Sequence, residues 1–206
     1  MSRKSRKALR REMVRITSSL DKRWLEAASS QICGRVGEIL DRELGDQIEH
    51  VLAFFAHFPG EVDLSAIIAK QLGRRQVYLP RIESGLSMRF FSISKDWYSQ
   101  LEPGPFGILQ PRVEGAKVYS TTEGSRTAAI VPGLAFDREG NRLSRDRGQY
   151  DVFLTRPELV DTVKIGVCWS LQLIPAVPAD SHHVMVDWLC HERDTIRTAT
   201  RFDENF

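Results

Sequence analysis

The sequence predicts an α/β fold: one domain over residues 1–206, with a largely parallel sheet flanked by helices and an N-terminal helical segment. Short continuous apolar runs predict strands that are covered on both faces, which is typical of parallel sheets. Helical patterns separate these runs along the chain and favour strand–helix–strand units. The sequence has no internal repeat and no low-complexity linker, so we expect a single domain.

Two amphipathic helices are predicted before the first strand. Apolar residues recur at steps of three and four from Leu9 to Leu20 and predict a helix with one buried side. A longer pattern from Trp24 to Leu40 predicts a second helix, which we expect to stop near Gly45. The apolar residues of the second helix, including Trp24, are expected in the core.

Apolar runs mark the predicted strands, at residues 51–55, 76–79, 87–91, 128–131 and 163–168. Pro80 and Arg81 are expected to end the second of them. Asp63 is expected to cap a short helix that terminates at Gly73. The segment 103–111 contains three prolines and two glycines, so we predict irregular structure there.

Composition limits the partners that we expect. The chain has 29 basic and 27 acidic residues, and its net charge of +2 gives no global attraction to nucleic acid. Cys33, Cys168 and Cys190 lack the spacing of a zinc ribbon or a disulfide framework, which favours a reducing, cytoplasmic setting. No run reaches the length of a membrane span and the basic start lacks an apolar leader, so we expect neither export nor a membrane anchor.

The stretch from Ile130 to Leu154 joins a predicted strand, a turn, a basic loop and a helix start. Asp137 and Gly140 have the positions of residues that open and close a tight turn. Charged and flexible residues then follow before the helix: Arg142, Arg145, Arg147 and Gly148. Guanidinium groups and backbone amides at a helix start suit a polyphosphate, and Asp151 suits a hard cation.

The main polar features also have purely structural interpretations. The basic loop is also consistent with a solvated surface segment whose arginines pair with Asp137 and Asp146. Glu61, just after a strand, is also consistent with a carboxylate stabilised by a helix N-terminus. Phe106 is either a platform for a flat ligand or a buried loop anchor.

Two further clusters leave alternatives open. Basic residues on the first helix either form a solvated face or reach a phosphate: Arg3, Arg6, Lys7 and Arg10. His183, Asp187 and His191 would share one face of a helix and suit a metal, but only if that segment is helical.

A series of motifs in a fixed order covers almost the whole chain. They are Leu9-Arg10, Glu61-Val62-Asp63, Leu79-Pro80-Arg81, Met88 before Phe90-Phe91, Phe106-Gly107-Ile108 with Pro111, Pro132-Gly133-Leu134 with Phe136-Asp137, Gly140-Asn141-Arg142-Leu143, Gly148, Tyr150-Asp151, Gln172, Val177-Pro178 and Val186-Asp187. In this order they resemble the 5-formyltetrahydrofolate cyclo-ligase family, also called methenyltetrahydrofolate synthetase.

The resemblance implies an ATP- and magnesium-dependent ring closure of 5-formyltetrahydrofolate to 5,10-methenyltetrahydrofolate, with release of ADP and phosphate. The implied partners are the small-molecule folate substrate and ATP, without nucleic acid or membrane, and the chain is expected to act as a monomer. Such chemistry depends mainly on positioning and charge neutralisation.

The resemblance also implies roles for individual residues. For ATP they are Arg6, Lys7, Arg10, Arg142, Ser144, Arg145, Arg147, Gly148 and Tyr150, of which Arg145 and Arg147 are implied to be catalytic. For the folate substrate they are Ala56, Glu61, Met88, Phe106 and Tyr150. For magnesium they are Asp151 and His183.

The loop differs from the family's common glycine-rich pattern. Ser144 and Asp146 stand at glycine positions, Gln149 at a tyrosine position, and His183 at the position of an aspartate metal ligand. These differences leave a second function open: a non-catalytic or repurposed relative that binds folate or nucleotide without this turnover.

Overall fold

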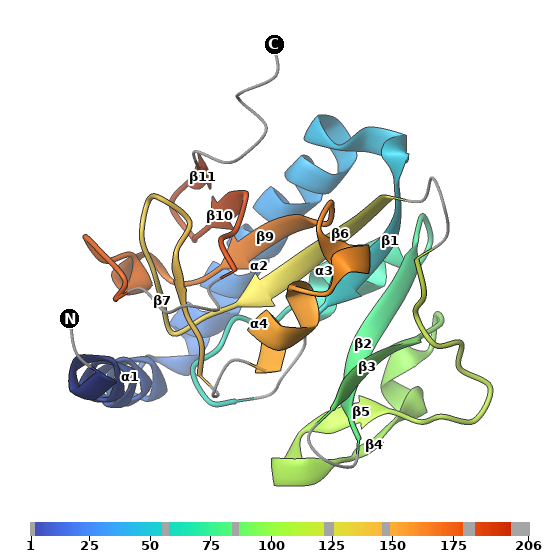
Figure 1. The fold of residues 1–206 in the computed structure, drawn as a ribbon, viewed down its shortest axis with the longest axis horizontal. Helices are drawn as coiled ribbons and strands as arrows, with labels where there is room; N and C mark the ends of the chain where they lie inside the picture. The colour runs from blue at the N-terminus through green and yellow to red at the C-terminus, as the bar shows by residue number, and fades with distance from the viewer. Residues whose placement is uncertain are drawn as a thin grey trace.

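A seven-stranded sheet organises residues 3–54, 58–83, 87–121, 126–145, 149–178 and 184–198, which the computed structural model describes (Figure 1). Its strands, in the order β11-β10-β9-β6-β1-β2-β3, are Thr195–Arg197, Trp188–Cys190, Val163–Val167, Arg126–Pro132, Ile48–Ala53, Gln76–Ile82 and Met88–Ser92. The five inner strands are parallel, and the edge strands β3 and β11 are antiparallel to their neighbours. The predicted α/β fold with a largely parallel sheet is confirmed.

Helices and two small hairpins complete the described part of the chain. The α-helices are α1 Arg3–Ser18, α2 Lys22–Glu38, α3 Ser65–Gln71 and α4 Gln149–Leu154, and a π-helical turn, Ile39–Glu43, extends α2. Short 3-10 turns lie at Gly45–Gln47, Trp97–Gln100, Pro105–Gly107, Pro157–Leu159 and Ser170–Gln172. The hairpins are β4 Leu101–Pro103 with β5 Leu109–Pro111, and β7 Ala135–Phe136 with β8 Arg142–Leu143. No described helix has the length and apolar character needed to cross a membrane.

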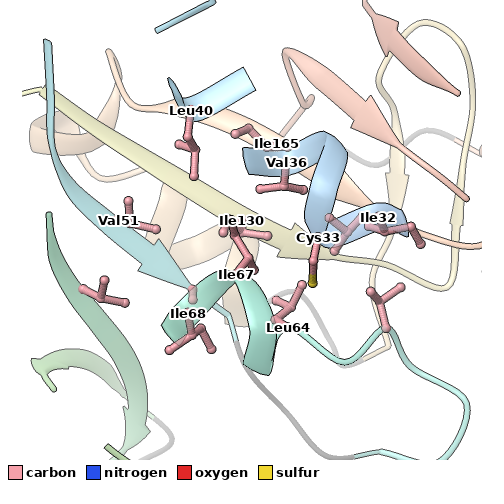
Figure 2. Packing of buried hydrophobic residues seen from close by; sticks show 14 of the residues in the cluster. Ile32, Cys33, Val36, Leu40, Val51, Leu64, Ile67, Ile68, Ile130 and Ile165 are labelled. Carbon is pink, nitrogen blue, oxygen red and sulfur yellow. The ribbon is translucent and has the colours of Figure 1, made fainter. Parts of the chain in front are cut away.

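Both faces of the central strands are covered. Successive residues of β1 and β6 point to opposite sides, so that Val51 and Ile130 pack in one cluster whereas Leu52 and Ala129 pack in another. The first cluster lies between the sheet and helices α2 and α3, and Figure 2 shows Val51, Ile130 and Ile165 of β1, β6 and β9 facing side chains of both helices. Since both faces are buried, the strands read as continuous apolar runs rather than alternating ones.

The predicted second helix is confirmed, with one exception in its core. Asp21 caps α2 by accepting a hydrogen bond of 3.0 Å from the Trp24 amide. Ala28, Ile32 and Val36 recur every four residues and are buried. The expectation that Trp24 is buried is wrong: it is 37% exposed, and its ring lies tilted against that of Trp169, with ring centroids 5.2 Å apart. Its position in the first turn explains this, because the four-residue spacing of the buried side begins only at Ala28.

Two predictions about proline-containing segments are wrong. β2 does not end at Pro80 but continues to Ile82, paired with β3. β1 pairs with β2 only up to Tyr78, so Pro80 lies where β2 has a neighbour on one side, a place where a missing amide N–H is tolerated. The segment 103–111 is not irregular, because its ends form the β4–β5 hairpin around Gly107, whose φ is 73°. A two-stranded hairpin leaves outward amides unpaired, so proline fits in it.

The short third helix is confirmed, but its N-cap residue is Leu64 and not the predicted Asp63, which lies one residue earlier. The Ser65 amide donates to Asp63 Oδ1 at 2.8 Å, so Asp63 stabilises the start of α3. The helix ends at Gln71, two residues before the predicted stop at Gly73. Its Ile67 and Ile68 are buried against the sheet (Figure 2).

Candidate active site at the carboxyl ends of β1 and β6

The order of the strands marks one place in the sheet as a candidate site. From β1 the chain first moves to β2 and β3, and later returns through β6 to β9, β10 and β11 on the other side. The crossover direction therefore changes between β1 and β6. In open α/β sheets, ligands bind outside the carboxyl ends of the strands at such a switch point. The loops that follow β1 and β6 there carry two of the sequence motifs, Glu61-Val62-Asp63 and the stretch from Pro132 to Asp151.

The loop after β1 is held firmly where it carries Glu61. Gly60 has a φ of 80°, and a Cβ at this position would lie 2.3 Å from the Thr17 carbonyl oxygen at the end of α1. Only glycine meets both conditions without strain. On the other side, the indole Nε1 of Trp169 donates to the Gly60 carbonyl at 2.8 Å. Glu61 is thus presented from a loop that is fixed by two distant parts of the chain.

The loop after β6 begins with the predicted turn. The Gly140 amide donates to the Asp137 carbonyl at 3.1 Å, and Gly140 has a φ of 88°. The Asp137 carboxylate accepts hydrogen bonds from both nitrogens of Asn141 and from the Val177 amide, each at 2.9 Å. The alternative in which Asp137 neutralises the loop arginines is therefore wrong, because its carboxylate closes the turn instead.

Arg142 is directed inward from β8. Its side chain is 1% exposed, and its guanidinium donates to Asp151 Oδ1 at 2.7 Å and to the Pro132 carbonyl at 3.0 Å. The ion pair ties the hairpin after β6 to the first turn of α4, where Asp151 lies. The alternative of a solvated surface loop is wrong for this arginine.

Arg145 meets Glu61 across the site. Its Nε donates to Glu61 Oε1 at 2.7 Å, and the two side chains are only 24% and 17% exposed. The guanidinium also stacks over the ring of Phe58, 4.7 Å from its centroid. A second nitrogen of the group, Nη2, is buried and has no hydrogen-bond partner among the described residues. A buried donor in this state is a place where a ligand oxygen would be favoured.

The first helix contacts the same loop. Arg10 Nε donates to the Ser144 carbonyl at 2.8 Å, so α1 is fixed against the residue that precedes Arg145. Arg6 is half-buried on α1, whereas Lys7 is exposed. In Figure 1, α1 lies on the side of the sheet to which the β6 arrow points. The helix that carries Arg6, Lys7 and Arg10 therefore lies on the candidate-site side of the molecule.

An aromatic cluster lies beside these charged groups. The Tyr150 ring is 4.5 Å from that of Phe54, which follows β1, and packs with Phe153 and Met88 in the cluster on the α4 face of the sheet. Met88 is buried. Apolar and charged surfaces thus meet at Tyr150, as a ligand with a flat ring and an anionic part would require.

Comparison with known proteins agrees with this geometry. A model of the 5-formyltetrahydrofolate cyclo-ligase family matches residues 2–192. The chain belongs to this family. It is 26% identical over 148 residues to the 5-formyltetrahydrofolate cyclo-ligase of Mus musculus, a match covering 68% of this chain and 72% of the relative. With the enzyme of that name from Haemophilus influenzae it shares 22% identity over 181 residues, covering 87% and 94%.

Two solved structures are similar to this fold. The NMR structure of the 5,10-methenyltetrahydrofolate synthetase from Aquifex aeolicus has a TM-score of 0.78 and 27% identity, and the match covers 95% of this chain and 93% of that one. The 5,10-methenyltetrahydrofolate synthetase from Mycoplasma pneumoniae has a TM-score of 0.67 and covers 91% and 98%, and its 17% identity supports the fold alone. The resemblance predicted from the sequence motifs is confirmed at the level of the family.

Several residues predicted for a cyclo-ligase site lie outside the described part of the chain. These are Ala56, Arg147, Gly148 and His183, together with Asp146. The backbone of Phe106 belongs to the Pro105–Gly107 turn in the β4–β5 hairpin, but its side chain is not described. The roles suggested for these residues stay predictions.

The alternative metal cluster near the C-terminus is wrong in its geometry. The described residues 184–198 contain strands β10 and β11 instead of a helix, so Asp187 and His191 do not share a helical face. Asp187 accepts the Lys164 amide at 2.7 Å, and His191 Nδ1 accepts two amides of its own turn at 3.2 Å. Burial raises the pKa of Asp187 and lowers that of His191. The β-branched Val184 and Val186 are consistent with this extended conformation.

For magnesium, the described residues supply one suitable carboxylate. No group of three or more histidine, cysteine or acidic residues suited to a metal ion occurs among them. Asp151 remains, with one oxygen held by Arg142. Magnesium commonly binds one or two carboxylates together with substrate phosphates and water, so this donor set fits a metal that arrives with a nucleotide.

Three supporting residues were not predicted as part of the site. Phe58 stacks on Arg145, and Gly60 and Trp169 fix the loop that carries Glu61. Pro59-Gly60 was visible in the sequence as a turn, which is a signal for a special backbone position. Nothing in the local sequence indicates that Phe58 or Trp169 contacts the site.

Proposed function

We propose that residues 1–206 act as one ATP- and magnesium-dependent cyclo-ligase that converts 5-formyltetrahydrofolate to 5,10-methenyltetrahydrofolate. Membership of the family supports this proposal. The observation that carries it is the contact between Glu61 and Arg145, which are 84 residues apart in the sequence yet meet at the switch point of the sheet. A carboxylate suited to the polar edge of a pterin and a guanidinium suited to a phosphoryl group thus lie within one site.

The proposed reaction needs phosphorylation before ring closure, because an amide-like formyl oxygen is a poor leaving group. The formyl oxygen attacks the γ-phosphorus of ATP, and the bond to ADP breaks. The second folate nitrogen then attacks the activated carbon and loses its proton. Finally the carbon–oxygen bond breaks, phosphate leaves, and the five-membered ring carries the methenyl carbon.

On the phosphate side, Arg145 is the residue that we propose to neutralise the transferred phosphoryl group. Its buried Nη2 supplies a donor that no described protein group uses. Arg10 fixes the backbone next to it, and Arg6 and Lys7 extend the positive surface of α1 toward the nucleotide. Arg147 and Gly148 would complete the loop around the phosphates.

Arg142 has a supporting part in this proposal. Its guanidinium is turned to Asp151 and Pro132, so it acts by holding the hairpin and α4 together. Asp151 would offer its carboxylate to magnesium from the first turn of α4, and the metal would offset phosphate charge when bound. His183 would be a weaker second ligand, because imidazole suits magnesium less well than carboxylate.

On the folate side, Glu61 is proposed to accept hydrogen bonds from the polar edge of the pterin. Tyr150 and Met88 provide an aromatic and an apolar surface in the neighbouring cluster. Ala56 and Phe106 are proposed to complete the contact with the ring system. In this arrangement Tyr150 lies between the two substrates, since it follows the phosphate loop and packs on Phe54.

We further propose that the protein works as a monomer in the cytoplasm, with folate and ATP as its small-molecule partners. The three free, buried cysteines support a reducing compartment such as the cytoplasm. The small net charge gives no global attraction to nucleic acid and so supports small-molecule partners.

One assay tests the proposed function directly. Purified protein with 5-formyltetrahydrofolate, magnesium and ATP is expected to produce the near-ultraviolet absorbance of the methenyl product. Omitting ATP is expected to abolish the signal. Thermal stabilisation by folate and nucleotide without any product, at high protein concentration, would instead support a binding relative.

A further inference from the structure

The contact between Glu61 and Arg145 joins two groups that the proposed function assigns to different substrates. Each group is mostly buried, and each is the other's ion-pair partner at 2.7 Å. A pterin and a phosphate would therefore compete with this protein contact when they bind. From this geometry, and on the basis of the proposed function, we infer that the ion pair couples the folate site to the nucleotide site.

The sign of the coupling follows from charge burial. A phosphate that binds Arg145 through two donors uses Nε together with the buried Nη2, so it displaces Glu61 from Nε and takes this cation away from a partly buried carboxylate. A pterin that hydrogen bonds to Glu61 likewise removes the carboxylate partner of the partly buried Arg145 guanidinium. Separating two such charges is unfavourable. The ligand that binds first bears the free-energy cost of separating Glu61 from Arg145. The second ligand then binds a group that is already separated from its partner, so each ligand increases the affinity for the other.

The structure indicates which side of the pair moves. Glu61 follows Gly60, which is fixed against α1 and hydrogen bonded by Trp169, so its loop is constrained. Arg145 has a long, rotatable side chain, and its contact with the Phe58 ring lets the planar group slide or turn with little loss of packing. The guanidinium is therefore the part that turns from the carboxylate toward the phosphates.

The coupling is reciprocal, because it is a property of the binding equilibria. We expect 5-formyltetrahydrofolate to bind about five- to tenfold more tightly in the presence of magnesium and a non-hydrolysable ATP analogue, within the usual range of such couplings. The analogue should bind more tightly with folate by the same factor. Calorimetric titration of the wild-type protein measures both.

A substitution separates this inference from a merely structural role of Glu61. Glu61→Gln keeps the side-chain shape and a hydrogen-bond acceptor but removes the charge that holds Arg145. Without any folate present, this variant is expected to bind the ATP analogue with magnesium about fivefold more tightly than wild type, since the cost of separating the pair has been removed. Damage to the site would weaken nucleotide binding instead.

Asp63→Asn is the matched control. It removes one negative charge from the same loop, at an exposed position that accepts the Ser65 amide before α3, and leaves the ion pair intact. A general field effect would tighten nucleotide binding equally in both variants and would overturn the inference. The inference predicts tighter binding for Glu61→Gln and nearly unchanged affinity for Asp63→Asn.

The outcomes distinguish the inference from the proposed function. If the wild-type protein binds neither ligand and forms no product, the proposed function is wrong. If it binds both ligands and turns over but shows equal affinities with and without the second ligand, only the coupling is wrong. Unchanged or weaker analogue binding by Glu61→Gln would also refute the coupling.

Discussion

Two arginines near opposite ends of the parallel strands differ in how completely they are hydrogen bonded. Arg75 precedes β2, and its side chain is 3% exposed. It makes five hydrogen bonds, to the side chains of Asp41 and Gln71 and to the carbonyls of Leu40, Gly45 and Ile48. Arg145, beyond β8, donates one to Glu61 and leaves the buried Nη2 without a partner among the described residues.

The difference separates a structural arginine from one that is suited to a ligand. A guanidinium has five N–H donors, so Arg75 has none left. Its partners belong to the π-helical turn after α2, the following 3-10 turn, α3 and the start of β1, and it joins these elements at the end of the sheet opposite the candidate site. Arg145 retains donor capacity at the end where ligands bind in this class of fold.

Removing the structural arginine is expected to have the largest effect of the changes considered. In Arg75→Met, the Asp41 carboxylate loses a buried partner and three carbonyls lose a donor, so we expect a loss of about 3–5 kcal/mol in the free energy of unfolding. Urea denaturation measures it. The affinity of the folded fraction for folate is expected to stay unchanged, and a specific loss of affinity would contradict the separation of the two roles.

Removing Arg145 is expected to lower activity strongly and to change stability little, the opposite of the effects expected for Arg75. Arg145→Met should lower kcat about 10²- to 10³-fold, the usual cost of losing one preorganised charge-stabilising group. The free energy of unfolding should change by about 1 kcal/mol or less, because the lost ion pair is partly exposed. Steady-state kinetics and urea denaturation measure the two effects.

Arg126→Met is the control for this second change. Arg126 contacts Gln47 at the opposite end of the sheet in an exposed hydrogen bond. We expect neither kcat nor stability to change substantially. Equal losses of kcat in both variants would show that total positive charge, and not the position of Arg145, sustains turnover.

The same comparison explains what the sequence could and could not predict. The strand before Pro132 and the turn from Asp137 to Gly140 depend on neighbouring residues, and both were predicted. The pairing of Glu61 with Arg145 depends on how two loops meet in the folded chain, and no local pattern encodes it. The motifs identified both residues separately but gave no sign that they contact each other.

Errors in the predicted secondary structure have a related origin. Pro80 and the segment 103–111 were judged by proline content alone, whereas strand pairing on one side only makes proline acceptable there. Trp24 was predicted to be buried from the periodicity of apolar residues, but periodicity does not show which turns of a helix extend past the core. Each error concerns an environment set by tertiary neighbours, which override local preference.

A smaller effect is expected at the glycine that positions Glu61. In Gly60→Ala, the new Cβ would collide with the Thr17 carbonyl at a φ of 80°, so we expect a loss of about 1–3 kcal/mol in stability. The displaced loop should also raise the KM for folate. Gly73→Ala is the control, since a Cβ there meets nothing within 4 Å. A loss of stability with an unchanged KM would show that Gly60 does not position Glu61.

The smallest effect concerns the acidic partner of Arg75 and depends on pH. Partial burial raises the pKa of Asp41, but hydrogen bonds from Lys70 and Arg75 and the charge of Arg74 outweigh this and hold it at about 2, below the ordinary 3.8. Because the folded-state pKa is lowered, the carboxylate stabilises the fold above pH 3.8, and this contribution is lost as the pH falls toward 2.

The test is the difference in unfolding free energy between wild type and Asp41→Asn as a function of pH. We expect a difference on the order of 1 kcal/mol at neutral pH, because two of the three basic partners are about half exposed. It should shrink as the pH falls from 3.8 toward 2. A difference near zero over the whole pH range would mean that the carbonyls of Leu40, Gly45 and Ile48 suffice to hold Arg75. In that case the saturation of the structural arginine, and its contrast with Arg145, would rest on the backbone and not on charge.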